Sequence, residues 1–167
     1  TSHPTRVFLL DDHEIVRRGV ASIIEAEDDL TVVGQAATAR AATRSVPRLE
    51  IDVAVLDISL GDGSGIEVCR RLREVAPLVR SVMLTSVIDE RALIAAKDAG
   101  AAAFVVKSVD TSELLHTIRR VGAGHCLLDS VDVRLAERSM EERGEAAVLI
   151  LTPQERAIFE LLGRDRS

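Results

Sequence analysis

Five short apolar runs, separated by segments with helical periodicity, are the feature that most constrains how this chain of 167 residues can fold. The runs are rich in Val, Ile, Leu and Phe, and they lack the polar alternation of a half-exposed strand. Such runs are typical of parallel strands that are buried on both faces of a sheet. They lie at about residues 6–10, 31–36, 51–56, 80–86 and 102–106.

The intervening segments predict helices at residues 13–27, 38–46, 65–75, 89–99 and 111–123. Strands that alternate with helices indicate an α/β fold with a parallel sheet, and right-handed crossovers leave only a few doubly wound topologies. We expect the flavodoxin-like strand order 2-1-3-4-5. In the first helix, the spacing predicts a single apolar face that carries Ile15, Val16, Val20, Ile23 and Ile24.

The pattern changes after residue 124. Residues 130–145 place Asp, Glu or Arg at almost every second position, which predicts a solvated amphipathic helix. Thr152, Pro153 and Glu155 then form a capping box at the start of another amphipathic helix. We therefore expect a domain at residues 5–125, a helical linker at 126–150, and at 151–167 the first helix of a second domain that is cut off.

Composition excludes several classes of protein. The net charge of −6 and the presence of only three aromatic residues, all Phe, argue against a nucleic-acid-binding surface in this chain itself. Two cysteines without CxxC spacing argue against a disulfide framework or a zinc site. No apolar run reaches the length of a membrane span, and no signal peptide is visible. We therefore expect a cytoplasmic protein that does not associate with membranes.

Acidic residues follow two of the predicted strands. Asp11 and Asp12 come directly after the first strand, and Asp57 ends the third. In the order 2-1-3-4-5 these strands are neighbours, and ligands bind beyond the carboxyl ends of the strands at this switch point. Crowded carboxylates raise each other's pKa, and a divalent cation removes that cost. Mg²⁺ suits the group best, because it takes one or two carboxylates, some waters and a phosphate oxygen.

Two further polar residues end strands at the same edge. Thr85 ends the fourth predicted strand, and Lys107 ends the fifth. A hydroxyl and an ammonium group can both donate hydrogen bonds to a phosphoryl oxygen. Together with Mg²⁺ and an acceptor carboxylate, they suit phosphoryl transfer, which depends chiefly on positioning and on neutralisation of charge.

Each of these residues alone has a plainer interpretation. Asp11 or Asp12 could cap the helix that follows, and Asp57 could be a turn residue before GDGSG. Thr85 could be an ordinary threonine at the end of a strand, and Lys107 could be a solvated surface lysine. The functional interpretation depends on the coincidence of suitable groups at the ends of four strands, all at one edge of the sheet.

The segments DDHEIVRRG, VLDISLGDGSG, MLTS and FVVK together resemble bacterial response-regulator receiver domains of the NarL/LuxR class, over about residues 5–125. LTPQERAIFELLGR resembles the first helix of the helix-turn-helix domain of that class, and GAGHCLLD is most similar to DevR/DosR-type regulators. The resemblance implies a two-component response regulator rather than an enzyme. Such a protein is phosphorylated by a sensor histidine kinase, forms a homodimer when active, and binds DNA through a C-terminal domain, so that no DNA-binding residue falls within this chain.

The resemblance also assigns roles to individual residues. Asp57 would be the phospho-acceptor, Lys107 would bridge to the phosphoryl group, and Thr85 would move toward it. Phe104 holds the position of the family's aromatic switch residue, which turns inward on activation. An ordinary core phenylalanine is the alternative interpretation of Phe104.

Four residues would bind Mg²⁺ if the resemblance holds. Asp12 would bind the ion directly and Asp11 mainly through water, beside Asp57 and the backbone carbonyl of Ser59. The chain departs from the family at Gly61, four residues after Asp57, where Pro is usual. Because Gly gives a loop more conformational freedom than Pro, we expect a less preorganised metal site.

Two other classes of function stay open as alternatives. One is a phosphorylation-independent receiver that keeps the fold as a protein-interaction module, although the intact set of polar residues argues against it. The other is an enzyme on a similar sheet. A flavodoxin-like FMN binder needs a first loop rich in Gly, Ser or Thr, where this chain has DDHE. A haloacid-dehalogenase-like phosphatase would place its second Asp two residues after the first, whereas Asp11 and Asp12 are adjacent.

Overall fold

The computed structural model describes residues 3–86, 89–107 and 110–128. Its main sheet has five parallel strands in the order β2-β1-β3-β6-β7, which is the predicted order 2-1-3-4-5. The fold class predicted from the sequence is therefore confirmed. The strands are β1 (Thr5–Leu10), β2 (Leu30–Ala36), β3 (Val53–Asp57), β6 (Arg80–Thr85) and β7 (Ala103–Val106).

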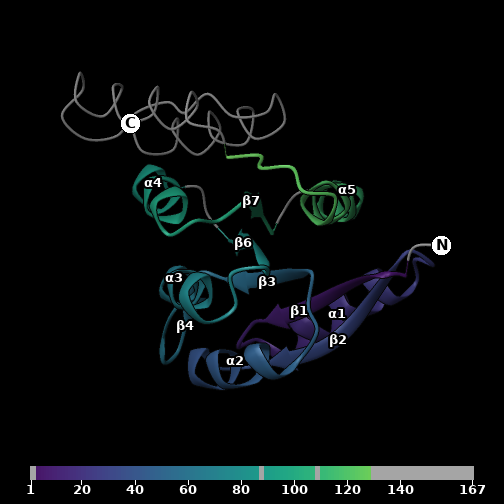
Figure 1. Cartoon of the computed structure of the whole chain (residues 1–167), viewed down its shortest axis with the longest axis horizontal. Coiled ribbons are helices and arrows are strands. Elements are labelled where there is room, and N and C mark those ends of the chain that lie inside the picture. The colour runs from purple at the N-terminus through teal and green to yellow at the C-terminus, as the bar shows by residue number, and fades with distance from the viewer. Residues whose placement is uncertain (1–2, 87–88, 108–109, 129–167) are drawn as a thin grey trace.

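Helices cover both faces of the sheet, and each lies inside the segment predicted for it. They are α1 (Glu14–Glu25), α2 (Ala39–Ser45), α3 (Gly65–Val75), α4 (Glu90–Asp98) and α5 (Thr111–Gly122), with a 3₁₀ turn η1 (Val46–Arg48) after α2. Figure 1 shows α2, α3 and α4 on one side of the sheet and α1 and α5 on the other. Within the described ranges, none of the helices has both the length and the apolar character that crossing a membrane requires.

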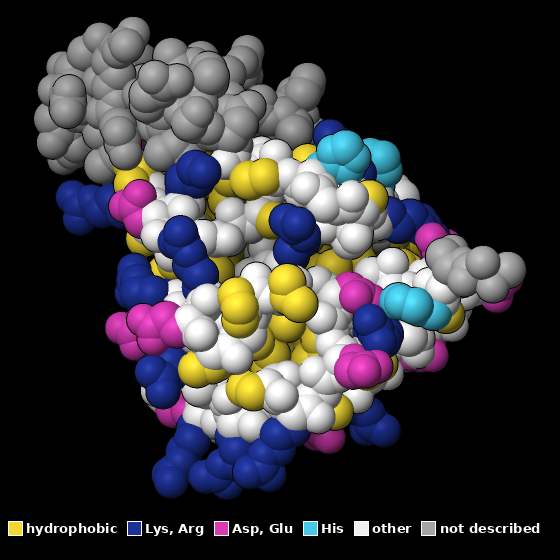
Figure 2. Space-filling view, in the orientation of Figure 1, with side chains coloured by type: hydrophobic (Ala, Val, Ile, Leu, Met, Phe, Trp, Pro, Cys, Tyr) yellow, Lys and Arg dark blue, Asp and Glu magenta, His cyan; other side chains and the backbone are white. Residues whose placement is uncertain are grey.

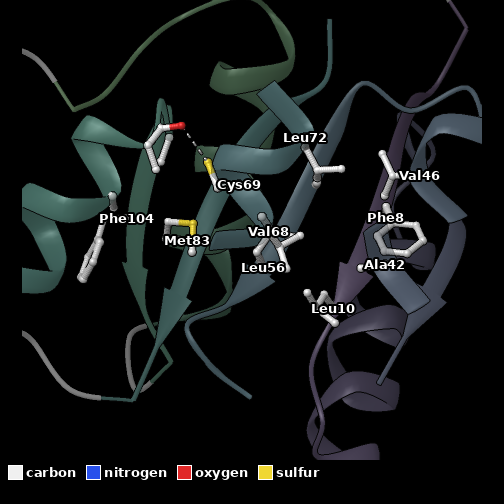
Figure 3. Packing of buried hydrophobic residues seen from close by; sticks show 14 of the residues in the cluster. Phe8, Leu10, Ala42, Val46, Leu56, Val68, Cys69, Leu72, Met83 and Phe104 are labelled. Carbon is white, nitrogen blue, oxygen red and sulfur yellow. Dashed lines mark hydrogen bonds between the residues drawn. The ribbon is translucent and has the colours of Figure 1, made fainter. Parts of the chain in front are cut away.

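The sheet separates two apolar clusters. Successive residues of a strand point to opposite faces, so Phe8 and Leu10 pack toward α2 and α3, while Val7 and Leu9 pack toward α1 and α5. Figure 3 shows the first cluster, in which Phe8 and Leu10 lie near side chains from α2 and α3. Because both faces are buried, these strands need apolar side chains at successive positions, which explains the absence of alternation in the sequence.

The apolar face predicted for α1 is wrong in the first turn of the helix. Ile24 is fully buried and Val20 packs against the same cluster, but Ile15 is 87% exposed. A helix turns by about 100° per residue, so the separation between Ile15 and Ile24 places them on opposite sides. Ala21 completes the buried face instead, and Val16 is partly exposed.

A small hairpin lies between β3 and α3, where the sequence predicted only a turn. Strand β4 (Ser59–Leu60) pairs in antiparallel fashion with β5 (Gly63–Ser64). The two strands form a separate sheet beside the carboxyl end of β3. The segment is too short to show a periodicity of its own, which is why pattern analysis did not detect it.

Only the beginning of the predicted linker lies within the described residues. The backbone amides of Leu127 and Leu128 donate hydrogen bonds to the Ala102 carbonyl at 2.6 and 3.2 Å, and Leu128 is buried. The chain therefore continues to pack on the domain for a few residues beyond 125. The predicted helical linker from 129 onward and the predicted helix at 151–167 lie outside the described residues.

Arg6 on β1 fastens the segment that precedes β3. Figure 2 shows acidic and basic side chains interspersed over the visible face of the molecule. The Arg6 guanidinium donates to the Asp52 carboxylate from Nε and Nη2, both at 3.2 Å, and the Arg6 amide donates to it at 2.8 Å. Glu50 accepts a further bond from Nη1 at 2.8 Å. These bonds from Arg6 hold the pKa of Asp52 below its ordinary value, despite an opposing effect of burial.

We expect Asp52→Asn to lower the urea midpoint of unfolding at neutral pH. The pKa of Asp52 is lower in the folded state than the value of about 3.9 for an unfolded chain. The ion pair therefore stabilises the fold above about pH 4, and this contribution is lost as the pH falls through the folded-state pKa. The difference between wild type and variant should shrink in acid.

Glu50→Gln is the matched control, because the Glu50 side chain is 88% exposed. Exposed ion pairs contribute little to stability, so this change should hardly move the midpoint. A difference between wild type and Asp52→Asn that stays constant from neutral pH to about pH 3 would contradict the interpretation.

Candidate functional site

The carboxyl ends of the strands bring together the residues that the sequence singled out. Asp57 is the last residue of β3 and pairs with Leu84 of β6, while Asp11 directly follows β1 and Lys107 directly follows β7. Because the strands are parallel, these ends meet at one edge of the sheet. Asp11 is 3% exposed there and Asp57 is 2% exposed. The predicted meeting of carboxylates from β1 and β3 is therefore observed.

Lys107 compensates the charge of the two buried carboxylates. Its Nζ lies 2.9 Å from Asp11 Oδ2 and 3.2 Å from Asp57 Oδ2. Its backbone amide donates to the Thr85 carbonyl at 2.6 Å, which fixes this strand end against β6. The side chain is only 17% exposed, so the alternative of a solvated surface lysine is wrong. One ammonium group balances two carboxylates only in part, and the site keeps a negative charge.

The environment changes the proton affinities of these groups. Burial raises the pKa of the Asp57 carboxyl; the charge of Lys107 opposes this shift, and the charge of Asp11 adds to it. Burial of Lys107 alone would lower the pKa of its ammonium. The hydrogen bond to Asp11 and the charges of both carboxylates outweigh burial and raise the pKa of Lys107. Lys107 therefore stays charged, while Asp57 has to be stabilised to carry its negative charge.

Asp12 lies at the more exposed rim of the site. Its Oδ2 accepts a hydrogen bond from the Gly61 amide at 3.1 Å, and its Oδ1 lies 3.1 Å from His13 Nδ1. The His13 amide donates to Asp11 Oδ1 at 2.8 Å. His13 itself is the N-cap residue of α1, without a side-chain cap bond. The alternative in which Asp11 or Asp12 caps this helix is therefore wrong.

The acidic residues fit a divalent cation. One ligand atom from each of Asp11, Asp12, His13 and Asp57 can be chosen so that all lie within 4.8 Å of one another. Asp11 Oδ2 and Asp57 Oδ2 are buried and accept no hydrogen bond of good geometry from the described residues. Buried carboxylate oxygens without a donor are costly, and Mg²⁺ prefers hard oxygen ligands of this kind. The donor set therefore fits Mg²⁺.

The other predicted residues lie at or near this edge. Thr85 is the last residue of β6, is buried, and pairs with Val106. The Ser59 amide donates to Asp57 Oδ1 at 3.3 Å, while the role predicted for the Ser59 carbonyl stays a prediction. Phe104 is 6% exposed and packs in the cluster on the α3 and α4 side, as Figure 3 shows. An inward ring suits a core residue and the inward form of a switch equally, so its switch role also stays a prediction.

Two helix caps in the segment GDGSG position the loop beside Asp57. The Asp62 carboxylate accepts the backbone amides of Ala39 at 2.8 Å and Arg40 at 3.2 Å, at the N-terminus of α2. The Ser64 hydroxyl accepts the Ile66 amide at 3.1 Å and caps α3. Ser64 could have been found from the sequence, because Ser before a helix is a capping signal. Asp62 caps a helix that is distant in the sequence, for which no local signal exists.

Gly65 allows α3 to begin directly against the acceptor strand. A Cβ atom at this position would lie 2.1 Å from the carbonyl oxygen of Asp57, a backbone atom that cannot turn aside. The Gly65 amide donates to the Ile58 carbonyl at 2.9 Å, which keeps the two segments in contact. The residue after Ser64 therefore has to lack a side chain if Asp57 is to stay where it is.

Comparison with known proteins agrees with this geometry. The sequence profile of the response regulator receiver domain matches residues 7–119. The DNA-binding transcriptional activator DevR/DosR of Mycobacterium tuberculosis is 43% identical over 162 residues, which cover 94% of this chain and 73% of that protein.

Solved structures share the fold. A LuxR-family two-component response regulator from Aurantimonas sp. SI85-9A1 superposes with a TM-score of 0.73 and 34% identity, over 85% of this chain and 99% of its own. The signal receiver domain of NarL from Mycobacterium tuberculosis superposes with a TM-score of 0.71 and 25% identity, over 74% of this chain and 100% of its own.

We expect Gly65→Ala to lower the free energy of unfolding by about 1–3 kcal/mol, the usual cost of overpacking. The added methyl group would overlap the Asp57 carbonyl oxygen, so either the start of α3 or the end of β3 has to move. Urea denaturation measures the change.

Gly61→Ala is the matched control within the same loop. The nearest atom to a Cβ at Gly61 is Asp12 Oδ2 at 3.8 Å, an ordinary contact, so stability should change by no more than about 0.5 kcal/mol. Equal stability of the two alanine variants would show that the close approach at Gly65 is not limiting.

Proposed function

The chain belongs to the response regulator receiver domain family, and from this premise we propose that Asp57 is its phospho-acceptor. The observation that carries the proposal is the buried Asp57 carboxylate, which ends β3 beside Asp11 and lies 3.2 Å from the ammonium of Lys107. The phosphoryl donor is a phosphohistidine on a sensor histidine kinase, the partner that the family uses.

The reaction is a displacement at phosphorus. An oxygen of the Asp57 carboxylate forms a bond to phosphorus while the bond from phosphorus to the histidine nitrogen breaks, and the imidazole leaves with the electron pair. The product is an acyl phosphate on Asp57. Mg²⁺, held by Asp12, Asp57 and the Ser59 carbonyl, with Asp11 through water, supplies neutralisation of the phosphoryl charge.

Lys107 and Thr85 distinguish the phosphorylated from the unphosphorylated form. The Lys107 ammonium already lies against Asp57, so phosphoryl oxygens on that residue give it new acceptors at the same place. Thr85 follows Leu84, the residue that pairs with Asp57, and its hydroxyl is a second donor near the acceptor. Contacts made only in the modified form bias a two-state equilibrium. Two charge-assisted contacts of about 1.5–3 kcal/mol each approach the roughly 5.5 kcal/mol that inverts a 1:99 population.

The proposal extends to control of transcription by the whole protein. The relative described as a DNA-binding transcriptional activator matches 94% of this chain, which supports a regulatory domain at residues 5–125. DNA binding would belong to a helix-turn-helix domain that begins near residue 151, joined by the linker at 126–150. Phosphorylation would promote a homodimer, which suits recognition of paired half-sites.

Incubation with acetyl phosphate and Mg²⁺ tests the acceptor. We expect the intact mass to rise by one phosphoryl group in wild type and not in Asp57→Asn, and we expect no adduct when Mg²⁺ is removed. The physical reason is that the nucleophile is one carboxylate whose charge repels phosphate unless the cation is present.

Beryllofluoride, which mimics the acyl phosphate, provides a second readout of the same site. Failure of wild type both to gain mass and to bind beryllofluoride would contradict the proposal. It would favour the alternative, a phosphorylation-independent receiver that serves as a protein-interaction module.

Mg²⁺ should also stabilise the folded protein. At tenfold excess over its dissociation constant, a ligand that binds only the folded state adds about 1.4 kcal/mol to the free energy of unfolding. Asp57→Asn removes a buried charge, so without Mg²⁺ it should unfold at a higher temperature than wild type, and it should gain less when Mg²⁺ is added. Thermal unfolding with Mg²⁺ and with a chelator measures both, and an equal response of the two proteins would count against Asp57 as a ligand.

A further inference from the structure

The backbone amide of Gly61 reaches across the site to Asp12. Its nitrogen lies 3.1 Å from Asp12 Oδ2, although the two residues are 49 positions apart in the sequence. Unlike Asp11, Asp12 is partly exposed, with 30% of its side chain accessible. A short carboxylate at an open rim has several staggered rotamers available. The hydrogen bond selects the rotamer in which Oδ2 faces the loop that follows β3.

We propose that the Gly61 amide is a positioning group that holds the Asp12 carboxylate in place for Mg²⁺, an inference that rests on the metal site proposed above. The bond is charge-assisted, since a neutral N–H donates to a carboxylate, and such bonds are stronger than neutral ones. Partners that orient the ligands of a metal in this way usually contribute to its affinity. Asp12 then gives up less rotational freedom when the ion binds.

The character of Gly61 indicates which property of this residue matters. Its φ is not positive, since Gly63, Gly100 and Gly124 are the glycines with positive φ among the described residues. A Cβ would meet nothing closer than Asp12 Oδ2 at 3.8 Å. The position therefore needs neither the conformational freedom of glycine nor its small size. The property that separates Gly61 from the usual Pro of the family is an amide hydrogen, which Pro lacks.

The adjacent residue holds the loop from the other side. Asp62 accepts the amides of Ala39 and Arg40 at the N-terminus of α2, and these bonds lower the pKa of Asp62 below its ordinary value. The tip of the β4–β5 hairpin is therefore fixed at two neighbouring residues, by a donor bond to Asp12 and by acceptor bonds from α2. The loss of preorganisation expected for Gly at this position is offset by a contact that Pro could not make.

Calorimetric titration with Mg²⁺ of wild type, Gly61→Ala and Gly61→Pro tests the inference. Both substitutions restrict the unfolded chain, but only Pro removes the amide hydrogen. We expect Gly61→Ala to bind Mg²⁺ within about twofold of wild type, and Gly61→Pro to bind roughly tenfold more weakly, the lower end of the range for partners of metal ligands. Circular dichroism establishes that each variant is folded.

A metal-free readout examines the bond itself. Hydrogen exchange of the Gly61 amide in the chelated protein should be slowed in wild type and in Asp12→Asn, whose side-chain oxygen can still accept, and fast in Asp12→Ala. Fast exchange in wild type would overturn the inference. So would equal Mg²⁺ affinity of Gly61→Pro and Gly61→Ala. If wild type binds no Mg²⁺ at all, the metal site proposed above fails and the inference fails with it.

Discussion

One buried ammonium group set between two buried carboxylates is the interaction on which the functional edge of this protein depends. The Lys107 ammonium approaches Asp11 and Asp57 at 2.9 and 3.2 Å, and both carboxylates are almost without solvent contact. Removing one partner of such a group leaves an uncompensated buried charge, which is strongly destabilising. Because the compensation is incomplete, the site carries excess negative charge even in the folded protein. That excess gives the site its attraction for a divalent cation.

Strands and loops contribute differently to this site. Parallel strands place Asp57 and Lys107 at one edge through backbone pairing, so their positions follow from the register of the sheet. Asp12 belongs to no strand, and the backbone of the loop at 61–65 determines its orientation. The same loop begins α3 against the Asp57 carbonyl. A rigid sheet therefore supplies the reacting groups, and a short loop with several bonded ends sets the position of the remaining ligand.

The sequence predicted the sheet order, the helices and the meeting of Asp57 with Asp11, because burial on both faces and parallel pairing leave a clear pattern in the residues. It failed at Ile15, where apolar character alone did not indicate which side of the helix was buried. It also missed the bond from Gly61 to Asp12. A backbone amide is present at every residue except Pro, so a long-range contact through it has no signature in the residue types.

The central position of β1 has a consequence for how the chain folds. Val7 to Leu10 pair with β2 on one side and with β3 on the other, and the β3 partners lie far along the sequence. Pairing between distant segments forms slowly, because loop closure must precede the contacts that reward it. During synthesis, β1 and its apolar neighbours wait for β3 with an open edge, a state prone to aggregation. The sheet register that assembles the site therefore also makes the newly made chain dependent on protection by chaperones.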